Sequence, residues 1–456
     1  MTNIRNLERL VRLTVPELQL DDGEYFSTEK DIFIRKPFGD HLYNLINNSE
    51  ENLVLALDSQ WGEGKSTFIK MWTNENRYNR EKPLETIYFD AFENDYQKEP
   101  FLALASEIYE LLEDKVTCKT TPFKEKAAKV FKTFSRGMIK TGVRIGTAGI
   151  ISDTSLEQAE KDISELVSEQ VDSIISSKFE SSKADKLALK NFKEFLSDIA
   201  LNHTSSGRIV FVIDELDRCR PDFALDLLEN IKHLFSVSGV TFLLVMNRKQ
   251  LEESVKCRYG SGIDSVTYLQ KFIDVWLSLP RKTEALSQED DGVTYLNNSF
   301  KLMADGRDIY NRDALLVITN LVRHLKPSFR DIERILTYFA LIENSRSAAF
   351  NQYYQDVMGT VCFLKVTNPK MLDNIMLGRA SSKDVLEYLQ LTDQNINPDS
   401  DPLTYLAIEI EYDLSAPERK KEIESNELID LRGYPSNPVN IFKRFIEKLS
   451  NIYPQY

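Results

Sequence analysis

The first 280 residues alternate short apolar runs with longer stretches in which apolar residues recur at helical spacing. Runs rich in β-branched and aromatic residues predict strands, and their alternation with helical patterns indicates a parallel sheet wrapped by helices. The predicted strands are residues 52–57, 86–92, 208–214, 241–246 and 275–280. We therefore expect an α/β fold with a parallel sheet flanked by helices.

Two wide intervals interrupt this alternation. Residues 113–205 contain no convincing strand, so we interpret them as a helical insertion that divides the α/β core into residues 1–112 and 206–281. The stretch RKTEALSQEDDG, which ends at residue 292, is polar and typical of a linker. It leads into residues 293–456, which have the pattern of an α-helical C-terminal domain.

Composition narrows the class of protein. Apolar residues make up 42% of the 456 residues and charged residues 28%, as in ordinary globular proteins. The net charge of -14 opposes indiscriminate binding to nucleic acid or anionic lipid. The 4 cysteines include no CxxC pair and the 4 histidines form no cluster beside them, so neither a disulfide framework nor a zinc site is indicated. Without an apolar signal core or a charge-free window of about 18 residues, we expect a cytoplasmic protein.

A glycine-bearing turn follows the first predicted strand, in LALDSQWGEGKSTFIKMW, residues 55–72. The phosphate-binding pattern G-x-x-x-x-G-K-[ST] follows a strand and opens a helix; its lysine contacts the β and γ phosphates and its hydroxyl binds Mg²⁺. Gly64, Lys65 and Ser66 fill the last three places, whereas Ser59 replaces the first glycine. The candidate ATP-binding residues are Ser59, Gln60, Trp61, Gly62, Glu63, Gly64, Lys65, Ser66 and Thr67. We expect the Glu63 side chain to point away from phosphate; the alternative is a glycine turn that precedes Lys-Ser by chance.

The stretch RIVFVIDELDR supplies the acidic half of such a site. Asp214 ends a buried strand and is a candidate to hold Mg²⁺ together with Ser66, and Glu215 is a candidate general base. The alternative is an ordinary strand with acidic residues at its exposed tip. For Asp217 and Arg218, the alternative is a surface ion pair that caps the next helix.

Asn247 follows the next predicted strand, where a γ-phosphate or attacking water would lie, and is a candidate sensor. Its alternative is a cap for the helix that starts near Lys249. The arginines that could neutralise transition-state charge are Arg218, Arg258, Arg281, Arg330 and Arg334. Residues before the first strand that could pack around the base are Phe33, Arg35 and Phe38.

Four stretches together resemble the KAP family of P-loop NTPases. They are DSQWGEGKST, TIYFDAFENDYQKEPFLALASEI, VIDELDRCRP and RYGSGIDSVTYLQKFIDVWLSLPR. The resemblance implies a P-loop NTPase fold. The sequence departs from the family pattern at Ser59, where glycine is usual, and at Glu215, where aspartate is frequent. SFRDIERIL is similar to the arginine-bearing sensor helix of related ATPases. Family members often carry transmembrane helices at the position of the insertion, but here the apolar run TGVRIGTAGIIS is too short to span.

The insertion also carries a basic stripe. Helical spacing gathers five basic residues on one side, opposite an apolar side: Lys129, Lys132, Arg136, Lys140 and Arg144. We favour pairing of this helix with the acidic helical pattern of residues 153–180 in an intramolecular hairpin. The alternatives are binding to a protein partner, to nucleic acid or, peripherally, to the inner membrane surface.

These features predict a Mg²⁺-dependent ATPase that acts as a nucleotide-driven switch or effector. Lys65 contacts the phosphates, Ser66 and Asp214 hold Mg²⁺, Glu215 activates water and Asn247 senses the γ-phosphate. For bacterial members, the family resemblance implies anti-phage defence or phage exclusion beside protein partners, and related ATPases suggest a homo-oligomer. The alternatives are a non-hydrolysing nucleotide-binding scaffold, which Ser59 permits, and an ATPase stimulated by nucleic acid, against which the net charge argues.

Overall fold

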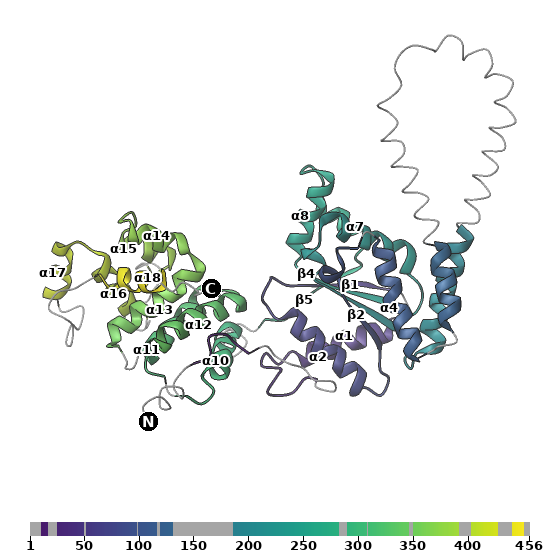
Figure 1. Ribbon diagram of the computed structural model, residues 1–456, viewed down its shortest axis with the longest axis horizontal. Helices are drawn as coiled ribbons and strands as arrows, with labels where there is room; N and C mark the ends of the chain where they lie inside the picture. The colour runs from purple at the N-terminus through teal and green to yellow at the C-terminus, as the bar shows by residue number, and fades with distance from the viewer. Residues whose placement is uncertain are drawn as a thin grey trace, which may run out of the picture.

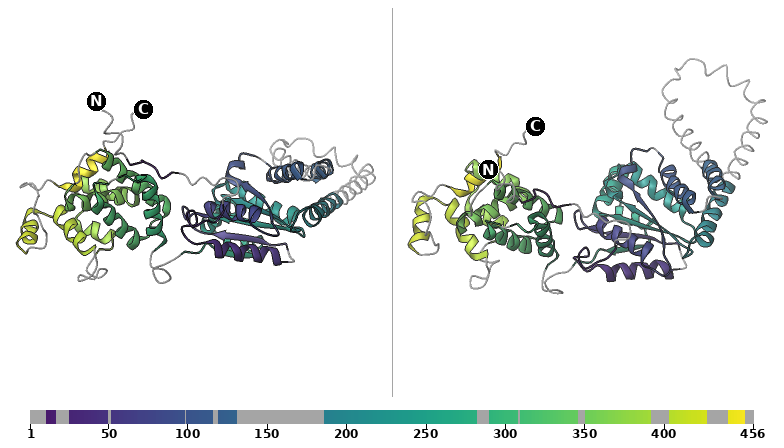
Figure 2. Two further views of the ribbon diagram at one scale, coloured as in Figure 1. Left: turned by 90° about the horizontal axis from the view of Figure 1, so that it is seen from below. Right: turned by 60° about the horizontal axis from the view of Figure 1, so that its bottom comes forward.

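The computed structural model describes most of the chain in two bodies, an α/β core and a domain of packed helices (Figure 1). The described residues are 11–16, 25–49, 52–97, 99–115, 119–130, 186–281, 290–307, 309–345, 350–391, 403–426 and 440–450. Figure 2 shows the same separation of the two bodies from two further directions.

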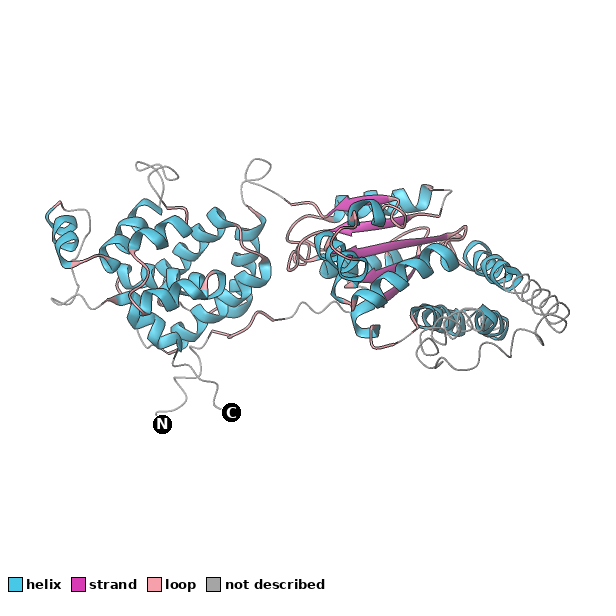
Figure 3. Cartoon of the chain, turned by 90° about the horizontal axis from the view of Figure 1, so that it is seen from above, coloured by secondary structure: helices cyan, strands magenta, loops and turns pink. Residues whose placement is uncertain are grey.

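The core contains a 5-stranded parallel sheet in the order β2-β3-β4-β1-β5, with helices on both faces (Figure 3). This confirms the predicted fold class. The strands are β1 (Val54–Asp58), β2 (Glu85–Asp90), β3 (Ile209–Asp214), β4 (Val240–Met246) and β5 (Val275–Ser278).

The predicted strands differ from the observed ones only near their ends. The strand predicted for residues 86–92 ends at Asp90, because the Asp90 side chain accepts the N–H of Glu93 and starts the short helix α3 (Ala91–Asn94). The strand predicted for residues 275–280 ends at Ser278, two residues before Pro280, which has no N–H to donate to a neighbouring strand.

Both faces of the sheet are buried. On one face, Leu55 and Leu57 of β1 share a hydrophobic cluster with Phe68 and Trp72 of α2. This face is covered by α1 (Lys36–Asn48) and α2 (Lys65–Tyr78). The other face is covered by α4 (Pro100–Lys115), α7 (Pro221–Asn230), a π-helical turn (Ile231–Phe235), α8 (Arg248–Tyr259) and α9 (Ser265–Leu269). Burial on both faces explains why β3 and β4 are almost entirely apolar.

The ends of the predicted insertion are helical and pack on the core. The described residues 120–130 and 186–203 are helical. Phe123 packs against Phe192 with 5.9 Å between ring centroids, and Lys119 pairs with Asp198 at 2.9 Å. Of the predicted basic stripe, only Lys129 is described; Lys132, Arg136, Lys140, Arg144 and the acidic stretch 153–180 lie outside the described residues. The hairpin therefore stays a prediction.

The C-terminal domain is built from helices around one hydrophobic core. These helices are α10 (Asp291–Ala304), α11 (Arg312–Leu325), α12 (Phe329–Asn344), α13 (Gln352–Thr367), α14 (Pro369–Met376), α15 (Ser382–Tyr388), α16 (Leu403–Leu414), α17 (Pro417–Ser425) and α18 (Ile441–Ser450). Across the described part of the chain, no helix has both the length and the apolar character that crossing a bilayer requires.

The N-terminal residues 11–16 attach to this helical domain. The Val11 N–H donates to Oδ1 of Asn344 at 2.7 Å, and the Asn344 amide donates back to the Val11 carbonyl at 2.7 Å. Val11 lies in the hydrophobic core of the domain. Val11, within the predicted range 1–112, thus belongs to the core of the helical domain.

Candidate functional site

The sheet order brings the two predicted halves of the site to one edge. β4 lies between β1 and β3, and its register places Met246 beside Asp58 and Val245 beside Asp214. Because the strands are parallel, their carboxyl ends lie at the same edge of the sheet, where open α/β sheets bind ligands. The glycine turn after β1 and the acidic residues after β3 therefore converge.

The glycine turn bends through two left-handed residues into helix α2. Gly62 and Gly64 both have φ of 78°, a conformation that glycine adopts at low cost, and Gly64 is the N-cap of α2. The first N–H groups of α2 have no partner within the helix and are available to an anion. The Lys65 ammonium group donates to the carbonyl of Ser59 at 2.5 Å and to that of Gln60 at 3.0 Å.

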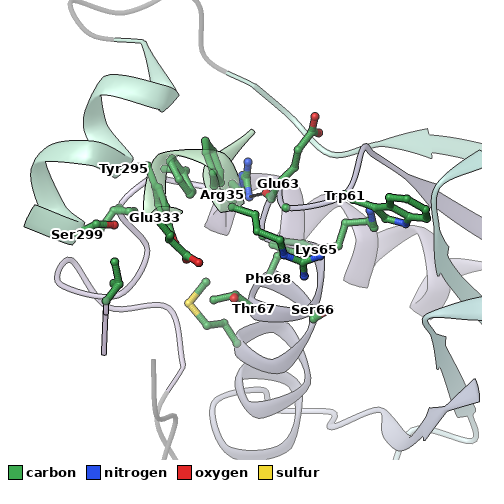
Figure 4. A pocket seen from close by; sticks show the side chains of 18 of the residues that line it. Arg35, Trp61, Glu63, Lys65, Ser66, Thr67, Phe68, Tyr295, Ser299 and Glu333 are labelled. Atoms are coloured by element: carbon green, nitrogen blue, oxygen red, sulfur yellow. Dashed lines mark hydrogen bonds between the residues drawn. The ribbon is translucent and has the colours of Figure 1, made fainter. Parts of the chain in front are cut away.

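Two arginines hold the turn at Glu63. Figure 4 shows the Glu63 side chain pointing away from Lys65, and it pairs with Arg281. The Glu63 carbonyl accepts a hydrogen bond from Nη1 of Arg35 at 3.0 Å. Arg35 is only 3% exposed, and burial lowers its pKa to about 10, so the side chain is still cationic at neutral pH.

The acidic residues after β3 are held by hydrogen bonds. Asp214 is 1% exposed and accepts from the Tyr88 hydroxyl at 2.9 Å and from the Glu215 N–H at 2.8 Å. Burial raises the pKa of Asp214, and hydrogen bonds from Ser66 and Tyr88 oppose that shift. This carboxylate is therefore available as a buried anion beside the turn.

Glu215 lies in a strained backbone conformation beside an arginine. Its φ is 58°, in the left-handed region, and its carboxylate accepts from Nη1 of Arg218 at 2.6 Å. Burial raises the pKa of Glu215, while the Arg218 charge opposes the shift. Asp217 instead accepts from the indole of Trp61. The interpretation of Asp217 and Arg218 as a surface ion pair is therefore wrong.

A cavity of about 620 Å³ lies over the turn, within the usual size range of ligand pockets. The predicted site residues that line it are Trp61, Gly62, Glu63, Gly64, Lys65, Ser66, Thr67, Asp214 and Glu215. Ser59, Gln60 and Asn247 are not among its lining residues. Ser59 and Gln60 contribute only their carbonyls, to Lys65.

Asn247 is the N-cap residue of helix α8, which begins at Arg248. Its side chain makes no capping hydrogen bond. The Arg248 N–H instead donates to Oδ1 of Asp58 at 2.9 Å. The alternative interpretation is therefore confirmed for the position of Asn247 but not for a side-chain cap, and the role of Asn247 as a sensor stays a prediction.

The helical domain forms one wall of the cavity, which the sequence did not predict. Tyr295 and Ser299 of α10 and Phe329, Arg330 and Glu333 of α12 line it, and Figure 4 shows Tyr295, Ser299 and Glu333 on the side opposite Trp61. A Cβ atom on Gly62 would lie 3.0 Å from Cβ of Arg330. The glycine turn between β1 and α2, called the phosphate loop below, is therefore in direct contact with the start of α12.

Of the residues predicted to surround the base, two line the cavity. Phe33 and Arg35 do so, and the Phe33 ring stacks on Phe329 with centroids 4.8 Å apart. Phe38 instead packs against Phe68 in the core, at 5.5 Å between centroids, so its assignment to the base is wrong. The cavity thus has an aromatic side that suits the flat face of a ring.

Among the candidate arginines, Arg218 and Arg330 line the cavity and Arg281 binds Glu63. Arg258 pairs with Asp226 at 2.7 Å and Arg334 with Asp331 at 3.9 Å, and neither lines the cavity.

Tyr88 is a site residue that sequence reasoning missed. In β2, positions 86, 88 and 90 share one face, and Asp90 lies beside Asp214 in the parallel register. The alternation in TIYFD could therefore have placed Tyr88 on the face that carries Asp214, given the strand pairing. The pairing itself was not readable from the sequence.

The residues present fit Mg²⁺. This ion takes oxygen ligands and is usually held by one or two carboxylates together with substrate phosphates and waters. Asp214 and Ser66 supply a buried carboxylate and a hydroxyl in contact with each other. Within the described ranges, no cluster of three or more His, Cys, Asp or Glu side chains is arranged to hold a metal. A site of this kind depends on the phosphates of the ligand.

A parallel sheet with a glycine turn, a lysine at the start of a helix and a buried carboxylate on a neighbouring strand defines a P-loop nucleotide-binding protein. The sequence model of the family described as the KAP family P-loop domain matches residues 35–346, which is more than half of the chain. The chain therefore belongs to the KAP family. This confirms the resemblance seen in the sequence.

Comparison with curated proteins gives no match. Among solved structures, the chain is similar to the Aeropyrum pernix ORC2 protein in ADPNP-ADP complexes, at 12% identity and a TM-score of 0.38, over 96% of this chain and 99% of that one. It is also similar to CDC6P from Pyrobaculum aerophilum, at 11% identity and a TM-score of 0.40, over 96% and 98% of the two chains. Similarities this weak support no inference about function.

Proposed function

We propose that this protein hydrolyses ATP in a Mg²⁺-dependent reaction and acts as a nucleotide-driven switch. The observation that carries the proposal is the meeting of Lys65, Ser66, Asp214 and Glu215 on the wall of one cavity. These are the side-chain types that phosphoryl transfer requires: a cation for the phosphates, oxygen ligands for the metal and a carboxylate for the attacking water.

Each residue has a separate task. The N–H groups at the start of α2 bind phosphate oxygens, and Lys65 contacts the β and γ phosphates. Ser66 and Asp214 would hold Mg²⁺, which neutralises charge that develops on the phosphate oxygens. Glu215 accepts a proton from water, and its raised pKa moves its basicity toward neutral pH. Asn247, which directly follows β4, is the proposed γ-phosphate sensor.

The proposed switch follows from the second wall of the cavity. Residues of α10 and α12 face the phosphate loop, and Arg330 lies against Gly62. A nucleotide in the cavity contacts both bodies of the protein, so a change in the phosphates alters contacts with the helical domain. The helical domain would then report the nucleotide state to a protein partner.

Phosphate release by the wild type and two variants tests the proposal. Glu215→Gln should lower the rate about 10²–10⁴-fold, the usual contribution of a general base. Lys65→Ala should weaken ATP binding about tenfold or more, because a hydrogen bond to a charged group contributes about 1.5–3 kcal/mol. The matched control is Lys70→Ala, which removes an exposed lysine from the same helix and should leave the rate unchanged.

Equal, background-level release from all four proteins would favour a non-hydrolysing nucleotide-binding scaffold. An increase in release on addition of DNA or RNA would instead favour a nucleic-acid-stimulated ATPase. Repeating the assay with anionic lipid vesicles tests for a membrane-surface role of the basic stripe.

We propose further that this ATPase serves anti-phage defence or phage exclusion together with partner proteins. The support is membership of the KAP family, whose bacterial members often have such roles. A plaque assay in bacteria that express the protein with its neighbouring genes tests this role. Protection should disappear with Lys65→Ala and persist with Lys70→Ala; equal plaque counts with and without the wild-type protein would count against it.

A further inference from the structure

A hydrogen bond joins the phosphate loop to the turn that carries the proposed base. The indole Nε1–H of Trp61 donates to Oδ2 of Asp217 at 2.5 Å. Trp61 lies in the loop after β1 and Asp217 in the 3₁₀ turn Leu216–Arg218 after β3. The bond therefore crosses from one half of the site to the other.

The exposure of Trp61 and Asp217 indicates that the hydrogen bond itself is the main contribution of the tryptophan. Asp217 is 5% exposed, and a buried carboxylate is costly unless it has a hydrogen-bond donor. Trp61 is 42% exposed, so its ring is not retained mainly to fill the core. Phenylalanine would give a similar apolar surface at this position but no donor. The specific contribution of tryptophan is its N–H.

Asp217 is close to both of the proposed catalytic groups. It follows Glu215 by two residues, and the left-handed backbone of Glu215, with φ of 58°, persists only where the surroundings hold it. Asp217 also lines the same cavity as Lys65. One carboxylate thus lies in the turn that follows Glu215 and faces the cavity that Lys65 lines.

We propose that the Trp61–Asp217 hydrogen bond is a latch that sets the position of the Glu215 turn relative to the phosphate loop. Trp61 and Asp217 are then positioning residues for hydrolysis, and this inference rests on the proposed function. A misplacement of about 1 Å at a reacting group can cost about 10²-fold in rate. Breaking the latch should therefore lower kcat more than it weakens ATP binding, because Lys65 and the N–H groups of α2 still contact the phosphates.

The test uses Trp61→Phe, which removes the donor but keeps an aromatic ring, and Asp217→Ala, which removes the acceptor. We expect each change to lower kcat for ATP about tenfold and to change KM less than about threefold. The double variant should be no slower than the slower single variant, because both changes remove the same bond. Asp217→Asn keeps an acceptor oxygen and should recover part of the lost rate.

The matched control is Trp276→Phe. Trp276 lies in β5, where Cζ of Arg248 is 4.6 Å from its ring centroid, and it does not line the cavity. The kcat of this variant should therefore stay within about twofold of the wild type. A Trp61→Phe variant that is as active as this control would overturn the latch. Additive losses in the double variant would overturn it as well.

A second measurement reports on the bond without hydrolysis. Of the 3 tryptophans, Trp72 is fully buried, so in the Trp276→Phe background Trp61 is the partly exposed fluorophore. Asp217→Ala should shift the emission of this protein, because the Trp61 indole loses a charged partner. Unchanged emission would count against the latch. Absence of phosphate release by the wild type would count against the proposed hydrolysis instead.

Discussion

Buried carboxyl groups occur in both bodies of this protein, but their surroundings differ. Asp214 in the α/β core is 1% exposed and Glu409 in the helical domain is 0% exposed. Asp214 accepts hydrogen bonds from the Tyr88 hydroxyl and the Glu215 N–H. No donor from the described parts of the chain reaches either oxygen of Glu409, whose neighbour is the carboxyl group of Asp356.

The absence of hydrogen-bond donors among the described residues around Glu409 changes its protonation state. Burial, with the Asp356 charge adding to it, raises the pKa of Glu409, and burial also raises the pKa of Asp356. A hydrogen bond between two carboxyl groups requires a proton on one of them, so the pair retains a proton that free carboxyl groups would lose. Glu409 is thus a neutral packing group at neutral pH, whereas Asp214 has the donors that stabilise an anion.

Asp413 in the helical domain shows that donors alone do not define a site. It accepts from the Tyr353 hydroxyl at 2.8 Å and from the N–H groups of Ile441 at 2.9 Å and Phe442 at 2.8 Å. Its oxygens therefore hold the first turn of α18, and it does not line the cavity. A functional carboxylate here needs burial, donors and an open side toward a ligand.

The largest effect should come from removing the charge of Asp214, the carboxylate that faces the cavity. Asp214→Asn should lower ATP hydrolysis by at least about 100-fold, because loss of even an outer-shell partner of a metal costs about 10–100-fold. The measurement is phosphate release with saturating ATP and Mg²⁺. The matched Asp413→Asn variant should unfold at a lower temperature but keep its rate per folded molecule. Similar losses of rate in both variants would contradict the distinction.

Removing the tyrosine donors should have a smaller effect that again separates the two regions. Tyr88→Phe should raise the Mg²⁺ concentration for half-maximal hydrolysis about tenfold, because the Asp214 carboxylate loses an orienting partner. Tyr353→Phe should leave the Mg²⁺ requirement unchanged and lower the free energy of unfolding by about 0.5–1.5 kcal/mol, the net contribution of one hydrogen bond, because both Asp413 oxygens keep an N–H donor. A shared shift in Mg²⁺ requirement would show that the effect is not local to Asp214.

The smallest effect should come from Glu409→Gln, and it should depend on pH. The pKa of Glu409 is raised from 4.5 to about 10 in the folded state, so between these values the folded protein holds a proton that the unfolded chain has lost. Stability from this group therefore falls as pH rises through that window. The glutamine variant should gain about 1 kcal/mol, or a Tm about 2–4 °C higher, near pH 8 and less near pH 5. Parallel Tm curves for both proteins across this range would contradict the shared proton.

Much of the fold and the centre of the site could be predicted. The strands were predicted within about two residues because both faces of the sheet are buried, which makes β3 and β4 almost entirely apolar. The meeting of Lys65 with Asp214 followed from a general property of parallel sheets, whose carboxyl ends share one edge. These predictions depend on local sequence patterns and on a rule that holds for the whole fold class.

The partners of the site residues could not be predicted in the same way. Tyr88 reaches Asp214 because β2 pairs with β3, and Trp61 reaches Asp217 because the two loops lie side by side. The wall formed by α10 and α12 depends on how the helical domain rests against the phosphate loop. Contacts between segments far apart in the sequence leave no periodic pattern from which to read them.

Helix α16 shows most directly where the sequence stops being sufficient. Glu409 and Asp413 are four residues apart, so the sequence alone determines that they share a face of a helix. On the facing helix α13, Tyr353 donates to Asp413, whereas Asp356 faces Glu409. Only the packing of the two helices decides that Asp413 meets a donor and that Glu409 meets another acid. The physical reason is that the protonation state of a carboxyl group depends on the few atoms within hydrogen-bond reach, and the sequence does not show which atoms these are.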